Sequence, residues 1–95
     1  MSNIDPKSLI AQRTAQTIII DVREADEFAG GHVDGAVNIP LSEIVARHQE
    51  IPDGAYLICQ TGSRSAMATE FLNQNGHHVT NIIGGTSAWP QALEV

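Results

Sequence analysis

Continuous apolar runs separate the amphipathic and polar stretches of this chain. The runs 17–22 and 56–59 are rich in Ile, Val and Leu and do not alternate with polar residues. Such runs are typical of strands that are covered on both faces of a parallel sheet. Weaker strands are predicted at 36–39, before Pro40, and at 78–83.

Helical signals fill the segments between these strands. Asp5 is a predicted N-cap with Pro6 at the first helical position, and Asp21 to Glu24 resembles a capping box that opens a short acidic helix through Phe28. Serines, glycines and an i,i+4 apolar spacing mark the other helices. In addition to the acidic helix, the predicted helices are 6–15, 43–48, 63–75 and a short one around Trp89 at 86–92.

The alternation of strands and helices predicts an α/β fold. We expect a small, open, mostly parallel sheet with helices on both faces, in one domain that covers residues 1–95. Ligands bind beyond the carboxyl ends of the strands in such sheets. Asp21 and Cys59 both stand at predicted strand ends, which indicates a functional site there.

Composition and charge exclude several function classes. The chain has 95 residues, a net charge of −6 and five basic residues that form no cluster, which argues against nucleic acid and against an anionic membrane surface as partners. Residues 1–7 contain no apolar signal core. We therefore expect a cytoplasmic protein without a membrane partner.

Cys59 is the only cysteine, so the chain cannot form an internal disulfide, which fits a reducing compartment. It follows an apolar strand and precedes a glycine-containing turn and a predicted helix. Backbone N–H groups in such a turn, together with the helix N-terminus, lower a thiol's pKa and favour a nucleophilic thiolate. The alternative is an inert buried thiol at a strand end.

The turn after Cys59 supplies candidate substrate contacts. Arg64 stands in the first turn of the predicted helix, where a positive charge is unfavourable because it opposes the helix macrodipole. A cation at this position is explained if it attracts a small anionic substrate to the loop. Alternatively, Arg64 forms only a surface ion pair with Glu70 or another acid. The candidate substrate-binding residues are Gln60, Thr61, Gly62, Ser63, Arg64 and Ser65.

The segment C-Q-T-G-S-R-S at 59–65 resembles the active-site loop of single-domain rhodanese-like sulfurtransferases. Three further segments are similar to motifs of that family: D-V-R at 21–23, E-F-A-G-G-H-V-D-G-A-V-N-I-P at 27–40 and I-G-G-T-S-A-W at 83–89. The resemblance therefore spans nearly the whole chain.

This resemblance implies a thiosulfate sulfurtransferase. Cys59 would take sulfur from a small anionic donor such as thiosulfate, form a persulfide, and pass the outer sulfur to cyanide, a thiol or a protein acceptor. Loop N–H groups would stabilise the persulfide, and Arg64 would recruit the donor. Gln60 differs from the charged residue of several thiosulfate-specialised relatives. No cofactor or metal is expected, because His77 and His78 would point to opposite faces of a strand.

Two other functions remain open from the sequence. A sulfur-carrier or regulatory module of the same fold would bind a partner and turn over slowly. Cysteine phosphatases place five residues between cysteine and arginine, whereas four separate Cys59 from Arg64. The smaller loop disfavours a phosphatase or an arsenate reductase. Asp21 and Arg23 are expected to form a structural cap and ion pair rather than to act in catalysis.

Overall fold

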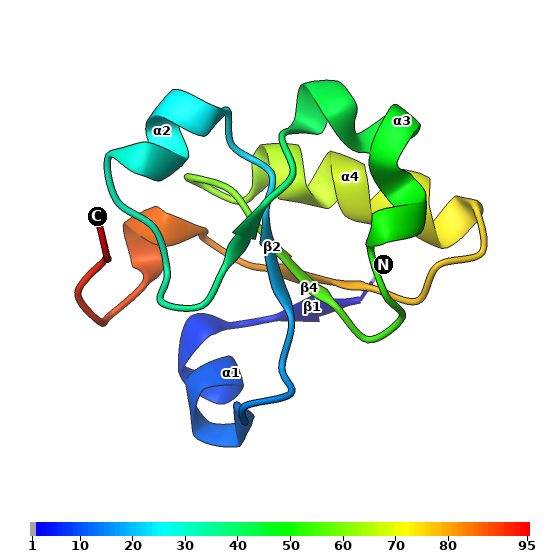
Figure 1. Cartoon of the computed structure of the whole chain (residues 1–95). Helices are drawn as coiled ribbons and strands as arrows, with labels where there is room; N and C mark the ends of the chain where they lie inside the picture. Colours follow the sequence, from blue (N-terminus) through cyan, green and yellow to red (C-terminus); the bar gives the residue numbers. More distant parts are fainter. Residues whose placement is uncertain (1) are drawn as a thin grey trace.

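A computed structural model, which describes residues 2–95, contains a five-stranded sheet in which every pair of neighbouring strands is parallel. The predicted α/β fold is confirmed (Figure 1). The strand order is β1-β5-β4-β2-β3. The strands are β1 (Asn3–Ile4), β2 (Ile19–Asp21), β3 (Val37–Asn38), β4 (Tyr56–Ile58) and β5 (Thr80–Ile82).

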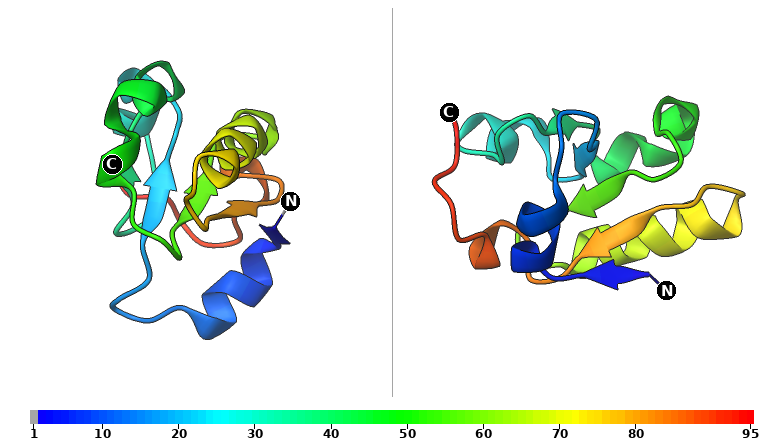
Figure 2. Two further views of the ribbon diagram at one scale, coloured as in Figure 1. Left: turned by 90° about the vertical axis from the view of Figure 1, so that its right-hand side faces the viewer. Right: turned by 90° about the horizontal axis from the view of Figure 1, so that it is seen from below.

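Helices cover both faces of this sheet, with α1 on one side and α3 and α4 on the other (Figures 1 and 2). The α-helices are α1 (Pro6–Gln12), α2 (Ala25–Ala29), α3 (Ile44–Arg47) and α4 (Ser63–Gln74). Short 3₁₀ turns are η1 (Leu41–Glu43), η2 (His48–Glu50) and η3 (Thr86–Ala88). Within residues 2–95, none of these helices is long and apolar enough to cross a membrane.

The core has two apolar layers, one on each face of the sheet. Successive residues of β4 point into different layers: Leu57 packs with Ala68 and Leu72 of α4, and Ile58 packs with Leu9 of α1 and with Trp89. The central strands β2 and β4 therefore contribute apolar residues to both layers, as the uninterrupted runs in the sequence predict.

Several element boundaries differ from the predictions. The N-terminal helix ends at Gln12 rather than residue 15, because Arg13 is extended and Thr14 enters a turn closed by Thr17. The predicted helix 86–92 is only the turn η3, since Trp89 has the extended backbone (φ −69°, ψ 120°) favoured before a proline.

The edges of the sheet were predicted least well. β1 was not predicted, because two residues give no periodic signal. β5 begins at Thr80 rather than residue 78, because the N–H groups of His78 and Val79 bond to the side chains of Asp53 and Asn73.

The acidic helix α2 also begins later than predicted. Its N-cap is Glu24, which forms a reciprocal capping box with Glu27. The prediction that the box starts at Asp21 is wrong, because Asp21 is the last residue of β2.

Candidate active site

The loop 59–65 leaves the carboxyl end of β4 and enters α4 directly. Cys59 is the first residue after the strand and is 0% exposed, so its sulfur lies beneath the loop rather than on an open surface. Gly62 has the left-handed backbone (φ 104°, ψ −11°) that turns the chain back over the thiol. A Cβ at Gly62 would lie 3.0 Å from the Gly84 nitrogen, so this turn requires glycine for space as well as conformation.

Two donors of the loop face the Cys59 sulfur. The Gly62 N–H donates to Sγ at 3.0 Å, and the Ser65 hydroxyl lies 3.3 Å from it. Ser65 is fully buried in the first turn of α4. Donors held in this way favour the negatively charged form of the sulfur.

Opposing effects set the pKa of the Cys59 thiol. Burial raises the pKa, but hydrogen bonds from the Ser65 side chain and from backbone N–H groups of the loop together lower it by more. The net result is a thiol pKa below its usual value. Cys59 is thus buried without the raised pKa that an inert thiol in apolar surroundings would have.

A second segment supports the loop from behind. The N–H of Thr86 donates to the Cys59 carbonyl at 2.8 Å, and the N–H of Ser87 donates to the Gln60 carbonyl at 2.9 Å. Gly85 lies so close that a Cβ there would overlap the Cys59 carbonyl oxygen and lie 2.6 Å from the Gln60 carbonyl carbon. Gly84 and Gly85 belong to the motif at 83–89, but their contact with the Cys59 loop was not predicted.

Arg64 is held by a carboxylate from another helix. Its two terminal nitrogens donate to the Glu27 oxygens at 2.7 and 2.9 Å, which ties α4 to α2. The hydrogen bond from Arg64 is the main cause that lowers the pKa of Glu27 to about 2. The alternative prediction for Arg64 was an ion pair with Glu70 or another acid. The structure contains such an ion pair, and its acid is Glu27 rather than Glu70.

The neighbouring strand end carries an ion pair. Asp21 and Arg23 are buried, and the Arg23 guanidinium donates to the Asp21 carboxylate at 2.8 Å and to the Gly31 carbonyl at 2.7 Å. The predicted structural ion pair is confirmed. The Asn38 amide adds donors to the Asp21 and Arg23 carbonyls, so this end of β2 is rigidly connected to β3.

The remaining candidates lie at the rim of the loop. Gln60, Thr61 and Ser63 are exposed, and Gln60 borders a surface hollow of about 400 Å³ that Glu27 and Thr86 also line. The loop therefore places the predicted substrate-binding residues at one edge of the sheet. The Ser65 side chain is buried under the loop, and the Arg64 side chain is paired with Glu27.

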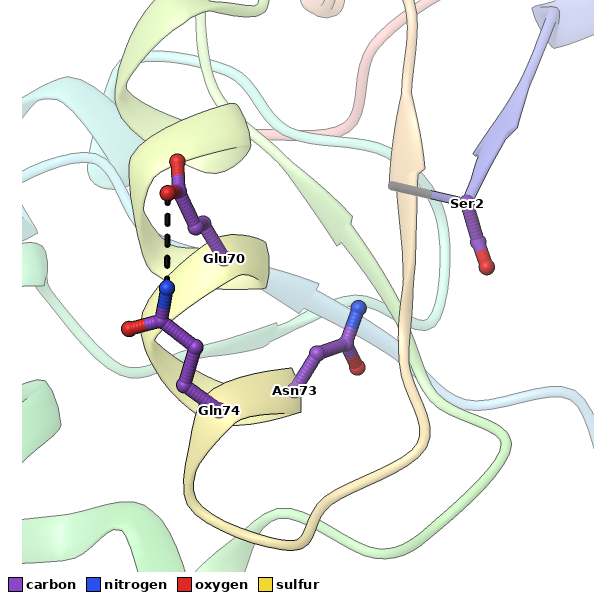
Figure 3. Close-up of a pocket in the computed structure, with 4 residues that line it drawn as sticks. All are labelled: Ser2, Glu70, Asn73 and Gln74. Atoms are coloured by element: carbon purple, nitrogen blue, oxygen red, sulfur yellow. Dashed lines mark hydrogen bonds between the residues drawn. The ribbon is translucent and has the colours of Figure 1, made fainter.

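A larger hollow of about 640 Å³ lies elsewhere (Figure 3). Polar side chains line it: Ser2, Glu70, Asn73 and Gln74. Asn73 is ten residues beyond Ser63 along α4, or about 15 Å at the rise of an α-helix. This hollow therefore lies away from the Cys59 loop.

Comparison with known proteins agrees with this geometry. The sequence profile described as "Rhodanese-like domain" matches residues 5–92. The chain belongs to the rhodanese-like domain family. A solved rhodanese-like domain protein from Staphylococcus aureus has a TM-score of 0.89 and 31% sequence identity, with 100% of this chain and 98% of that one covered.

Curated relatives extend the similarity of this rhodanese-like domain. An Allochromatium vinosum protein named "Sulfurtransferase" is 36% identical over 94% of this chain and 88% of its own length. The uncharacterized protein YqhL of Bacillus subtilis is 46% identical over 75% of this chain, which spans 59% of that protein. The family is one of rhodanese-like sulfurtransferases.

Proposed function

We propose that this rhodanese-like domain transfers sulfane sulfur from a donor such as thiosulfate to cyanide or a thiol, through a persulfide on Cys59. The observation that carries the proposal is the Cys59 sulfur held by the Gly62 N–H and facing the Ser65 hydroxyl, with a lowered thiol pKa. We take residues 1–95 as the domain that performs this transfer.

The reaction has two displacements at sulfur. The Cys59 thiolate attacks the outer sulfur of thiosulfate, a new S–S bond forms, and sulfite leaves with the electron pair of the broken bond. Cyanide or a thiolate then attacks the outer sulfur of the persulfide, and the Cys59 thiolate leaves. The atoms and electrons balance without an external oxidant, a cofactor or a general base.

The loop supplies stabilisation of negative charge in both steps. The terminal persulfide sulfur would lie toward the centre of the loop, where N–H groups between Gln60 and Ser65 surround it. Thr61, Gly62 and Ser63 shape this cup. The four-residue spacing between Cys59 and Arg64 makes a cup suited to one sulfur atom, and less suited to a tetrahedral phosphate.

Arg64 recruits the anionic donor in this proposal, in competition with Glu27. The Arg64 side chain is 33% exposed, and its guanidinium is bonded to both Glu27 oxygens. A thiosulfate ion must therefore share Arg64 with Glu27 or displace it. The structure thus supports weaker recruitment than an unpaired arginine would give.

A turnover assay tests the proposal. The protein is mixed with thiosulfate and cyanide, and thiocyanate release is followed for the parent chain and for Cys59→Ala. Catalytic release by the parent, absent in Cys59→Ala, is expected. Equal release by both proteins would reject Cys59 as the nucleophile.

A sulfur carrier of the same fold is the second candidate, favoured by the complete burial of Cys59 and the pairing of Arg64. A carrier would form the persulfide and discharge it slowly to small acceptors. One added sulfur per chain, with little thiocyanate release under excess cyanide, would favour the carrier over the enzyme.

A further inference from the structure

The hydroxyl of Ser65 has three possible hydrogen-bond acceptors but only one proton to donate. Its oxygen lies 2.6 Å from Asn81 Oδ1, 3.3 Å from Cys59 Sγ and 3.3 Å from the Gly62 carbonyl oxygen. Ser65 is fully buried, and a serine hydroxyl can donate only one hydrogen bond at a time. The residue that fixes this hydroxyl therefore affects whether the sulfur receives a donor.

Asn81 is the nearest of these neighbours and is itself buried, at 5% exposed. It lies in β5, paired with Leu57 in the strand that leads to Cys59. Its Nδ2 donates to Asn3 Oδ1 of β1 at 3.2 Å. A row of polar side chains thus runs from the edge of the sheet through Asn81 and Ser65 to the Cys59 sulfur.

An amide suits this position because it carries both a donor and an acceptor. With a neutral thiol, Ser65 donates to Asn81 Oδ1, as in the structure. With a charged sulfur, the charge-assisted bond from Ser65 to sulfur is the stronger one. Rotation of the Asn81 amide then places an N–H toward Ser65 Oγ, and the Asn3 amide can reverse with it.

We propose that Asn81 is a positioning residue for sulfur transfer: it holds Ser65 Oγ so that the hydroxyl proton points to Cys59 whenever the sulfur is anionic. Without Asn81, Ser65 Oγ loses its 2.6 Å neighbour and is no longer held in place, so the Gly62 carbonyl can compete with the sulfur for the hydroxyl proton. The inference rests on the proposed role of Cys59 as the nucleophile. It adds a buried residue of β5 to the site.

The rate of Cys59 alkylation by iodoacetamide, measured from pH 5 to pH 10, tests this proposal. A lost hydrogen bond to a charged group predicts alkylation of Asn81→Ala about tenfold slower at pH 7, with the midpoint of the pH profile moved upward and the high-pH plateau unchanged. The matched control is Asn73→Ala, whose amide bonds only to the backbone of Val79. That control is expected to keep the parent profile.

A double-mutant cycle separates this role from a merely structural one. Ser65→Ala should slow alkylation as Asn81→Ala does, and the double variant should be no slower than Ser65→Ala alone. Additive effects, or an unchanged midpoint in folded Asn81→Ala, would overturn the proposal.

Two more variants secure the test if Asn81→Ala does not fold. Asn81→Leu nearly preserves side-chain size and is expected to give the same upward midpoint. Asn3→Ala changes an exposed edge residue and should move the midpoint in the same direction by less. An unchanged midpoint in Asn3→Ala and in whichever Asn81 variant folds would overturn the proposal. Alkylation needs no sulfur donor, so these outcomes are independent of whether the protein turns over thiosulfate.

Discussion

The carboxyl ends of β2 and β4 are neighbours in one parallel sheet, but the first holds a buried ion pair and the second a buried thiol. At the end of β2, the buried charge of Asp21 is neutralised by Arg23, which also bonds to the Gly31 carbonyl. At the end of β4, the buried sulfur of Cys59 faces an N–H group and a hydroxyl, and no cation within residues 2–95 is bonded to it.

The difference shows how burial can serve stability or reactivity. A buried ion pair whose hydrogen bonds are complete has little capacity to accept a substrate, so it fixes loops in place. A sulfur that faces donors and has no opposite charge can gain stabilisation as it ionises or takes up a second sulfur. Substitutions at the two strand ends should therefore have different consequences.

The sharpest contrast is expected from Cys59→Ser. This nearly isosteric change should abolish sulfur transfer, because an alcohol neither ionises near neutral pH nor forms a persulfide, while the free energy of unfolding changes by about 1 kcal/mol. Thiocyanate release and urea unfolding measure the two effects. The control Ser2→Ala, at an exposed position outside the loop, should retain transfer, and residual turnover in Cys59→Ser would contradict the assignment.

The opposite pattern is expected from Asp21→Ala. Removal of the carboxylate leaves the Arg23 guanidinium buried without its counter-charge, which should lower the free energy of unfolding by about 3–5 kcal/mol. Urea denaturation measures this loss. Asp26→Ala, at an exposed position of α2, should cost only about 0.5 kcal/mol. Equal stability of the two variants would show that the buried pair is not structural.

Gly85 offers a way to disturb the β4 end without touching its chemistry. Gly85→Ala forces a Cβ against the Cys59 and Gln60 backbone at a left-handed φ of 60°, so we expect a loss of about 2–4 kcal/mol and slower transfer. Gly76→Ala also places a side chain at a positive φ (86°) but has open space around it, and should cost about 1–2 kcal/mol. Similar losses of stability and activity in both variants would argue against close packing behind the loop.

The smallest effect is expected from the contact between the loop and α2. Glu27→Gln keeps a residue able to complete the capping box but removes the charge that holds Arg64, so the thiosulfate KM should fall about two- to fivefold with kcat unchanged. Arg64→Ala should raise the KM instead. Steady-state kinetics measures both, with Glu70→Gln as the control. An unchanged KM in Arg64→Ala would remove its recruitment role.

The same ion pair predicts a pH effect on stability. Because the pKa of Glu27 is lowered from 4.5 to about 2, its stabilisation is present above pH 4.5 and is lost as the pH falls toward 2. The stability difference between the parent and Glu27→Gln should shrink over this range, when urea unfolding is compared at successive pH values. A difference that stays constant from pH 7 to pH 2 would contradict the lowered pKa.

The sequence predicted the centre of this fold better than its contacts between elements. The runs 17–22 and 56–59 were recognisable because both faces of β2 and β4 are buried, and Cys59 was recognisable from the strand, turn and helix around it. Trp89 lies in the core. The helix predicted around it at 86–92 is only a short turn, because the effect of Pro90 on Trp89 outweighed the helical signal.

Local sequence patterns could not predict the hydrogen-bond partners of the loop residues. Glu27 lies 37 positions before Arg64, and Asn81 lies 16 positions after Ser65. Hydrogen bonds at such separations depend on the order of strands in the sheet, which the alternation of elements does not specify. A buried asparagine in the middle of an apolar strand was the available signal for Asn81, because such a residue must find hydrogen-bond partners.

The most direct test of the account is the intact mass of the protein after incubation with thiosulfate and removal of excess reagent, followed by peptide mapping. We expect one added sulfur per chain, located on Cys59, absent from Cys59→Ser and removed by cyanide. A parent chain that stays unmodified by thiosulfate and by polysulfide alike, while correctly folded, would contradict the persulfide mechanism.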